Sequence, residues 1–218
     1  MDRYDDDVRD SQKDRWNNKH ASYERGQLVY DDWLDLFDRV IVECRTPIID
    51  LGCGSGNDTL YLLEKGKQVI PCDYSEKAIE NIKKNFPEVD RTECFDMLKG
   101  LPFPDNFTDI VIADLTLHYF REQATFEVLE DIKRVLRPNG LLLFRVNSMN
   151  DVNYGAGEGL EVERHLFLTE DSGYKRFFDA DDIDHFFNGW DMFYMQEEDM
   201  TRYEKPKKLW RCVAKVNK

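Results

Sequence analysis

The sequence predicts an α/β fold in which a mostly parallel sheet carries helices on both faces. Apolar runs typical of buried strands alternate with helical patterns from about residue 29 onward, and this alternation is typical of parallel sheets. Residues 47–57 (PIIDLGCGSGN) pass from an apolar strand into alternating glycines before a helical pattern. That is the junction where backbone N–H groups meet a ligand. We therefore expect functional residues beyond the carboxyl ends of the strands.

The elements are expected in a regular order. Residues 29–42 place apolar side chains at helical spacing, which predicts a covering helix before the first strand. Strands are then predicted at residues 48–51, 68–72, 92–95, 109–113 and 140–146. Helices are predicted at residues 58–65, 75–85 and 125–136, the second with Ser75 as its N-cap and the third ended by Pro138 and Gly140. A helix opening at residues 177–183 and a strand at residues 209–214 close the chain.

Length and composition exclude several classes of protein. A chain of 218 residues is long enough for one α/β core and too short for two full-sized domains. With 41% hydrophobic and 34% charged residues, a disordered chain is not expected, and no apolar run approaches the roughly 18 residues of a transmembrane helix. The acidic N-terminus has no features of a secretory signal, so a cytoplasmic location is expected.

Charge and cysteine content restrict the partners. The formal net charge of −14 repels phosphate backbones, so neither nucleic acid nor a membrane is expected as a partner. The basic residues Lys205, Lys207 and Lys208 flank a proline and are interpreted as a solvated turn before the last strand. No C-x-x-C pair with zinc spacing occurs and no metal site is predicted. Buried, reduced thiols are expected at Cys44, Cys53, Cys72, Cys94 and Cys212.

The spacing of the glycines separates two classes of nucleotide site. A dinucleotide fingerprint, G-x-G-x-x-G, requires glycine at position 57, where the chain has Asn57. The observed G-x-G-x-G, with Asp50 two residues before it, resembles motif I of the class I S-adenosylmethionine-dependent methyltransferases. A tight turn without a ligand is the alternative. The resemblance implies S-adenosyl-L-methionine as cofactor, S-adenosyl-L-homocysteine as product, and cofactor contacts from Asp50, Gly52, Cys53, Gly54 and Gly56.

Acids at the next two strand ends extend the resemblance. Asp73 closes the second strand, where a carboxylate can accept hydrogen bonds from ribose hydroxyls; the alternative is a turn acid before Ser75. In this family an acid at the end of the third strand accepts from the adenine amino group, which implies adenine contacts from Asp96 and the amide of Met97. Tyr74, beside Asp73, is included in the predicted cofactor site.

The later turn also fits the family. Residues 135–144 (VLRPNGLLLF) resemble its "LRPGG" segment, with Asn139 in place of the first glycine, and asparagine tolerates a positive φ. The resemblance covers residues 46–147. It implies a Rossmann-like, doubly wound, seven-stranded sheet with a C-terminal antiparallel strand. Within a single domain, 1–218, we expect an N-terminal lid and covering helix (1–45), a cofactor-binding core (46–147), and an acceptor-side loop with a C-terminal hairpin (148–218).

Methyl transfer in this family depends mainly on alignment and exclusion of water. Asp114 is expected to bring its backbone carbonyl to the amino group of the cofactor's methionine part, with its side chain assisting or facing the acceptor. His118 is a candidate general base or acceptor contact; the alternative is that it packs and caps the next helix. Arg145, inside an apolar strand, either holds an anionic acceptor or forms a salt bridge with Asp114 or a helix acid.

The N-terminal residues 16–23 (WNNKHASY) loosely resemble the lead-in of the tellurite-resistance and thiopurine-type branches. In those enzymes the first residues fold over the cofactor, which implies a lid with cofactor contacts from Trp16 and Tyr23. Packing of a first helix is the alternative.

The sequence therefore predicts a methyltransferase that acts on a small polar or anionic acceptor, as a monomer or weak homodimer. The polar, glycine-bearing loop at residues 147–159 is where such enzymes build the acceptor pocket. A binding module without turnover and a protein methyltransferase remain as alternatives. A nicotinamide-dependent oxidoreductase is disfavoured by Asn57 and is not supported by Asp96.

Overall fold

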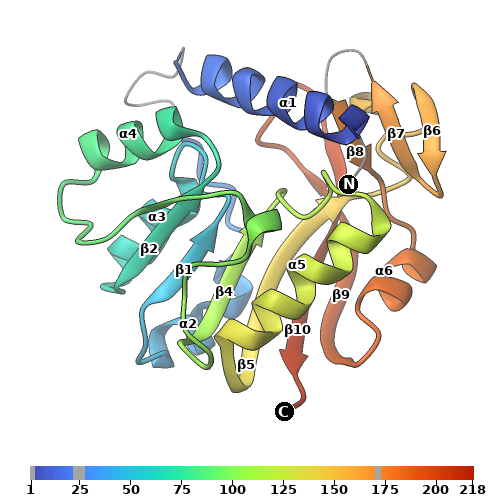
Figure 1. Cartoon of the computed structure of the whole chain (residues 1–218). Helices are drawn as coiled ribbons and strands as arrows, with labels where there is room; N and C mark the ends of the chain where they lie inside the picture. The colour runs from blue at the N-terminus through green and yellow to red at the C-terminus, as the bar shows by residue number, and fades with distance from the viewer. Residues whose placement is uncertain (1–2, 22–27, 170–172) are drawn as a thin grey trace.

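A computed structural model of the chain describes residues 3–21, 28–169 and 173–218. Its centre is a seven-stranded sheet of order β3-β2-β1-β4-β5-β10-β9 (Figure 1). The strands are β1 (Ile48–Leu51), β2 (Val69–Asp73), β3 (Glu93–Cys94), β4 (Thr108–Asp114), β5 (Leu136–Asn147), β9 (Trp190–Met200) and β10 (Lys207–Val216). β1 to β5 pair in parallel, whereas β10 is antiparallel to both β5 and β9. The predicted Rossmann-like sheet with a C-terminal antiparallel strand is confirmed.

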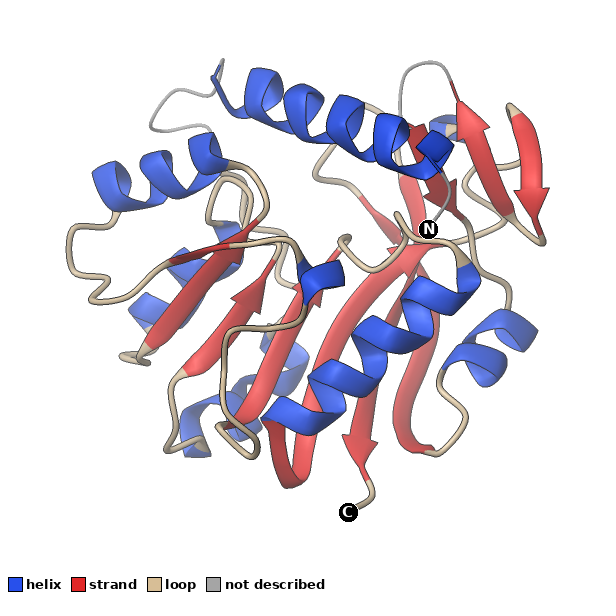
Figure 2. Cartoon of the chain, viewed as in Figure 1, coloured by secondary structure: helices blue, strands red, loops and turns tan. Residues whose placement is uncertain are grey.

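Helices cover both faces of this sheet (Figure 2). They are α1 (Arg3–Ala21), α2 (Asp38–Glu43), α3 (Asn57–Glu64), α4 (Glu76–Asn85), α5 (Glu122–Val135) and α6 (Ala180–Phe186), with short 3-10 turns η1 (Asp35–Phe37), η2 (Met97–Lys99) and η3 (Val152–Tyr154). A separate antiparallel sheet contains β6 (Leu160–Glu163), β7 (Leu166–Thr169) and β8 (Gly173–Arg176). Among the described residues, no helix combines the length and apolarity needed to cross a membrane.

Alternate residues of the central strands belong to two different cores. Ile49 of β1 packs in a cluster that includes the apolar side chains of α5 and α6, whereas its neighbour Ile48 packs with Trp33 and with Leu62 of α3. Because both faces of the strands are buried, the sequence runs are continuously apolar rather than alternating. This explains why the strands were predicted close to their observed positions.

The helix predicted at residues 29–42 is wrong over its first part. The chain forms turns before η1 and α2, and Asp32 has a φ of 57°, which interrupts a helix. Trp33 is wholly buried and its Nε1 donates to Asp58 Oδ1 at 2.8 Å. Leu36 and Val40, expected on the packed face, are exposed. Burial of Trp33 therefore determines the course of this segment.

Two local predictions are confirmed and one boundary is corrected. Ser75 Oγ accepts from the N–H of Ala78 and caps α4, and Asn139 has a φ of 65°. β5, however, begins at Leu136 instead of residue 140, directly after α5. The register with β4 shifts between Thr108 and Ile110, so the turn around Asn139 bulges out of a continuous strand.

All five cysteines are free thiols. Four are buried as expected, but Cys94 is exposed. β3 is only two residues long and pairs with β2 at the edge of the sheet, so it offers little cover for this side chain. The expectation of a buried thiol at Cys94 was wrong.

Candidate active site

A cavity of about 660 Å³ opens beyond the carboxyl ends of the central strands, where the strand order changes between β1 and β4. Most of the predicted site residues line it: Trp16, Gly52, Cys53, Gly54, Asp73, Tyr74, Asp96, Met97, Asp114 and His118. Asp50, Gly56 and Arg145 are not part of its wall. Tyr23 lies outside the described residues.

The glycine loop runs along the wall of the cavity. Gly52 has a φ of 77°, and a Cβ at that position would lie 2.3 Å from Thr116 Oγ1, so a larger residue would clash. The N–H of Gly54 donates to Asp73 Oδ2 at 2.9 Å, and the N–H of Ser75 donates to Asp73 Oδ1 at 2.8 Å. The carboxylate of Asp73 thus holds the loop against the end of β2.

Asp50 and Gly56 shape this loop from behind. Thr59 Oγ1 donates to Asp50 Oδ2 at 2.6 Å, and burial raises the pKa of Asp50 to about 7. A Cβ on Gly56 would lie 2.6 Å from the ring of Phe86. Position 56, where α3 packs on α4, therefore requires glycine. Asp50 and Gly56, both predicted to contact the cofactor, thus lie behind the residues that line the cavity.

Carboxylates converge on the cavity from four places. Asp73 and Asp114 end β2 and β4, and Asp96 precedes η2, where it accepts from the N–H of Leu98 at 3.0 Å. Asp58, in the first turn of α3, also lines the cavity and was not predicted. Burial raises its pKa well above the usual range. The hydrogen bond from Trp33, far away in sequence, holds this side chain, and no local pattern indicates it.

Arg145 is part of a buried ion-pair cluster. Its side chain is 1% exposed, and its Nε and Nη2 donate to the two carboxylate oxygens of Asp114 at 2.7 and 2.8 Å. Its Nη1 donates to Asp31 Oδ2 at 2.8 Å, and Arg202 Nη2 donates to Asp114 Oδ2 at 3.1 Å. Burial opposes ionisation, but Arg145 and Arg202 lower the pKa of Asp114 to about 2.

This cluster bears on the two explanations of Arg145. The salt bridge with Asp114 is present, and the guanidinium lies outside the cavity wall. The salt bridge is the predicted alternative that the structure shows for Arg145. Arg202, from the connection between β9 and β10, lines the cavity instead.

His118 is buried in the cavity wall, 2% exposed. Burial, together with the charges of Lys207 and Lys175, lowers its pKa well below the usual value, so the imidazole is neutral at pH 7. Its Nδ1 has no hydrogen-bond partner among the described residues. The capping alternative is not what the structure shows, because the N-cap of α5 is Arg121 and no side chain caps it.

Basic side chains form the part of the wall that the sequence did not reveal. Lys207 was expected in a solvated turn, yet it is 4% exposed and its Nζ lies 2.6 Å from Asp151 Oδ2. Lys207 starts β10 and shares a strand face with buried Leu209, so the period-2 pattern extended back by two residues would have indicated this burial. Lys175 and Arg202 also line the cavity.

The acidic and the basic side chains of the cavity wall therefore come from different parts of the chain. The carboxylates come from the glycine-loop half of the chain: Asp58, Asp73, Asp96 and Asp114. The cations come from α1, the start of α5 and the C-terminal part: Arg15, Lys19, Arg121, Lys175, Arg202 and Lys207. A chain with a net charge of −14 thus has a cavity wall that contains six cations beside its carboxylates.

Helix α1 lies across the carboxyl end of the sheet, between α4 and the β6–β8 sheet (Figure 1). Ser75 Oγ donates to Asn17 Oδ1 at 2.7 Å, and the Nδ2 of Asn81 donates to the carbonyl of His20 at 2.9 Å. The rings of Trp16 and Tyr119 meet edge to face, with centroids 5.5 Å apart. Polar contacts on α4 and an aromatic contact over the cavity thus hold this helix in place.

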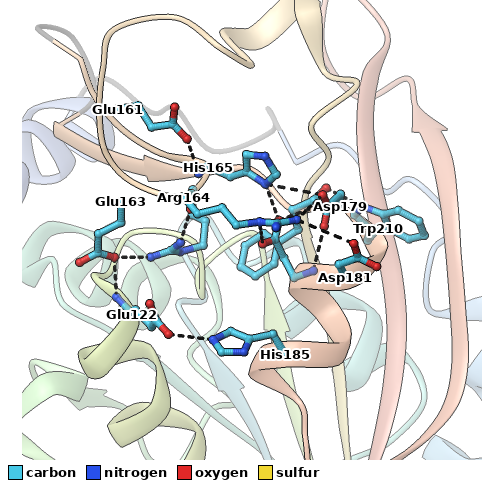
Figure 3. A network of polar contacts seen from close by, with 12 residues as sticks. Glu122, Glu161, Glu163, Arg164, His165, Asp179, Asp181, His185 and Trp210 are labelled. Carbon is cyan, nitrogen blue, oxygen red and sulfur yellow. Dashed lines mark hydrogen bonds and ion pairs between the residues drawn. The ribbon is translucent and has the colours of Figure 1, made fainter.

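A polar network fixes the small sheet beside the cavity (Figure 3). Glu163 Oε2 accepts from the N–H of Glu122 at 2.8 Å and from Arg176 Nη2 at 2.6 Å. Arg164 Nη2 lies 2.8 Å from Asp179 Oδ2 at the start of α6. These contacts join the sheet to α5 and α6, and they position β8, which carries Lys175.

Part of this network has the composition of a metal site. The ligand atoms of His165, Asp179 and Asp182 all lie within 4.8 Å of one another. However, Asp179 and Asp182 form the capping box of α6, and Arg164 pairs with both, at 2.8 and 3.1 Å. Capping and ion pairing account for both carboxylates, so we assign this group a structural role.

Comparison with known proteins finds similarity to methyltransferases. Residues 49–144 match the methyltransferase domain family. A probable S-adenosylmethionine-dependent methyltransferase of Mycobacterium tuberculosis is 29% identical over 141 residues, 64% of this chain and 47% of that protein. The tRNA N(3)-methylcytidine methyltransferase Mettl2 of Drosophila melanogaster is 37% identical over 119 residues, 50% of this chain and 36% of that protein. The chain spans about half, or less, of the length of these relatives.

The fold agrees with that match. In Burkholderia thailandensis, 1,6-didemethyltoxoflavin-N1-methyltransferase with bound 1,6-didemethyltoxoflavin and S-adenosylhomocysteine has a TM-score of 0.65 at 17% identity, covering 86% of this chain and 80% of that chain. The matched residues 49–144 begin in β1 and end in β5, and they include the glycine loop and the strand-end carboxylates. Sequence match, sheet order and the position of the cavity agree, and together they support a class I S-adenosylmethionine-dependent methyltransferase.

Proposed function

We propose that this chain transfers a methyl group from S-adenosyl-L-methionine to a small polar or anionic acceptor. The observation that carries the proposal is the composition of the cavity wall, which has carboxylates on the glycine-loop half and cations from α1, the start of α5, β8 and β10. The cofactor is a cation at its sulfonium, which suits the acidic part. The basic part suits an acceptor with negative charge.

The residues present fit the cofactor. A Cβ on Gly54 would lie 3.5 Å from His20 Cε1 of α1, so glycine keeps the backbone of the loop uncovered by a side chain of its own. We assign the ribose hydroxyls to Asp73, the adenine edge to Asp96 and the amide of Met97, and the methionine amino group to the carbonyl of Asp114. When bound there, the cofactor supplies an electrophilic methyl group.

The chain itself supplies alignment and a dry cavity. We propose that residues 1–45 act as lid and covering segment, with α1 and Trp16 excluding water, that residues 46–147 hold the cofactor, and that residues 148–218 form the acceptor side. His118, neutral and buried, is the side chain we assign to acceptor contact. A neutral imidazole can accept a proton from an acceptor that arrives protonated.

Other acceptors are the alternatives. The tRNA methyltransferase among the relatives motivates a tRNA acceptor, and a protein acceptor would need only a side chain that reaches the cavity. The net charge of −14 opposes tRNA binding. A module that binds the cofactor without turnover is the third alternative.

The test is formation of S-adenosylhomocysteine by the purified chain with three acceptor pools: small carboxylates and phosphates, a peptide array, and total tRNA. Turnover with the first pool alone supports the proposal. Turnover with tRNA or peptides alone would reassign the acceptor, and cofactor binding without turnover on any pool would favour the binding module.

A further inference from the structure

Besides His20 Nδ1 of α1, the part of the cavity wall beside β8 contains two buried polar atoms with no hydrogen-bond partner among the described residues. They are Asn147 Oδ1, on a wholly buried side chain at the end of β5, and His118 Nδ1. Leaving such atoms unpaired costs free energy comparable to that of a lost hydrogen bond. Their position in a cavity indicates that a ligand completes these hydrogen bonds.

Backbone hydrogen bonds bring both residues to one place. The N–H of Arg176 donates to the carbonyl of His118 at 2.7 Å, and Asn147 Nδ2 donates to the carbonyl of Arg176 at 3.3 Å. This second bond uses the amide donor of Asn147 and leaves its Oδ1 as an acceptor. Lys175, the next residue along β8, lines the same part of the cavity.

The charge of Lys175 is not matched by a carboxylate. Its Nζ donates to the carbonyl of Tyr154 at 2.6 Å, and among the described residues it forms no ion pair within 4 Å. Lys207 lies close by, with its Nζ 4.9 Å from the centre of the Tyr154 ring, but Asp151 neutralises it. Among the side chains of this corner that the structure describes, Lys175 is therefore a cation without an ion-pair partner within 4 Å.

We propose that the methyl acceptor carries a compact oxyanion, a carboxylate or a phosphate, bound by Lys175 beside the Lys207–Asp151 pair, and an N–H or O–H group that donates to Asn147 Oδ1 beside His118. The proposal rests on the proposed methyltransferase function for the identity of this ligand as the acceptor. The tyrosine rings of the wall, Tyr119, Tyr154, Tyr174 and Tyr203, favour a planar body between these two groups.

The test uses benzoate, phenyl phosphate and the neutral benzamide as probes, titrated calorimetrically into the whole chain with and without S-adenosylhomocysteine. We expect at least one of the two anions to bind about tenfold or more tightly than benzamide. The anion that binds more tightly distinguishes carboxylate from phosphate recognition. Equal affinity for benzamide and both anions, or binding of none of the three, would overturn the proposal.

Substitution locates the anion site. Lys175→Met should lower the affinity for the bound anion about tenfold or more, whereas Lys208→Met should leave it within about twofold. Lys208 is the matched control because it is a lysine next to Lys207 in β10. Its side chain pairs with Asp199 at the surface. An unchanged affinity in Lys175→Met would overturn the proposal.

A measurement on the unaltered chain keeps the test independent of how the variants fold. Burial and the charge of Lys207 lower the pKa of Lys175 to about 8. Lys19 lowers this pKa further, whereas Asp151 and Glu158 raise it. Anion affinity should therefore fall between about pH 7 and about pH 9 as Lys175 loses its proton. A constant affinity over that range would contradict the proposal. Failure to bind S-adenosylhomocysteine would contradict the proposed methyltransferase function. The titration of the anions without S-adenosylhomocysteine would still test the anion site.

Discussion

Arg145 and Asp114 occupy directly paired positions on the neighbouring parallel strands β5 and β4, and their side chains form two hydrogen bonds at 2.7 and 2.8 Å. The pair lies at the carboxyl end of the sheet, and Asp114 faces the cavity while Arg145 lies behind it. Arg145 thus fixes the carboxylate of a residue that we assign to the cofactor. Its role is positional.

Arg145→Leu should destabilise the chain more than it alters any acceptor contact. The substitution leaves Asp114 and Asp31 buried without this partner, which costs about 3–5 kcal/mol in the free energy of unfolding. Urea unfolding measures the loss. The control is Arg39→Leu, whose side chain is 89% exposed and pairs with Glu43, and which should change stability by about 0.5 kcal/mol or less. A stable Arg145→Leu variant that binds cofactor but lacks turnover would restore the acceptor role.

Asp73→Ala should weaken binding of S-adenosylmethionine. The substitution removes charge-assisted hydrogen bonds to the ribose, about 1.5–3 kcal/mol each, and also the bonds that hold Gly54 and Ser75. Calorimetric titration gives the affinity. Asp105→Ala, at a surface position 71% exposed, is the control and should bind normally. An unchanged affinity in Asp73→Ala would place the ribose elsewhere.

Asp50→Asn should stabilise the chain in a pH-dependent way. The folded-state pKa of about 7 lies above the ordinary value of 3.8, so the protonated carboxyl is favoured in the folded chain. Its stabilising contribution is complete below about pH 4 and is lost as the pH rises through about 7. Asparagine still accepts from Thr59 and carries no charge.

Thermal unfolding at pH 5 and pH 8 checks this prediction. Asp50→Asn should unfold at a higher temperature than the parent chain at pH 8, where the parent carries a buried charge. The gain should shrink at pH 5, because Asp50 is then protonated in the folded parent chain. The free energy of unfolding that depends on this protonation is on the order of a few kcal/mol. Asp105→Asn, exposed at the surface, should show no such difference. A gain that is the same at both pH values would mean that Asp50 is ionised throughout.

Trp16 should report cofactor binding if α1 is a lid. Its ring contacts Tyr119 over the cavity, so cofactor binding should change the intrinsic fluorescence of the parent chain. Trp16→Phe should lose that change. Trp190→Phe, which alters a residue packed in the core, should retain it. A full response in Trp16→Phe would leave α1 as a packing helix.

The sequence predicted those features that depend on local patterns. Strands buried on both faces read as apolar runs, and the ends of parallel strands share one edge, which brings Asp73, Asp96 and Asp114 to a single cavity. The positive φ of Asn139 followed from residue type alone. These predictions needed no knowledge of distant contacts.

Other features depend on contacts between distant segments. The course of residues 29–34 is set by the bond of Trp33 to Asp58, and the burial of Lys207 by its pairing with Asp151 in another connection. Arg202 is held at the cavity by its hydrogen bond to Asp114, which is remote in sequence. Trp33 is apolar and the strand pattern indicates the burial of Lys207, but neither pattern shows the distant partner, and nothing in the local context of Arg202 indicates that it lines the cavity.

The central claim is the cofactor site, and calorimetric titration with S-adenosylmethionine, S-adenosylhomocysteine and NADH tests it most directly. Binding of these three ligands distinguishes a site for S-adenosylmethionine, expected from the G-x-G-x-G loop with Asn57, from a dinucleotide site. We predict binding of both sulfur nucleotides, one per chain, and no binding of NADH. Binding of NADH alone, or of none of the three, would contradict the assignment of this cavity.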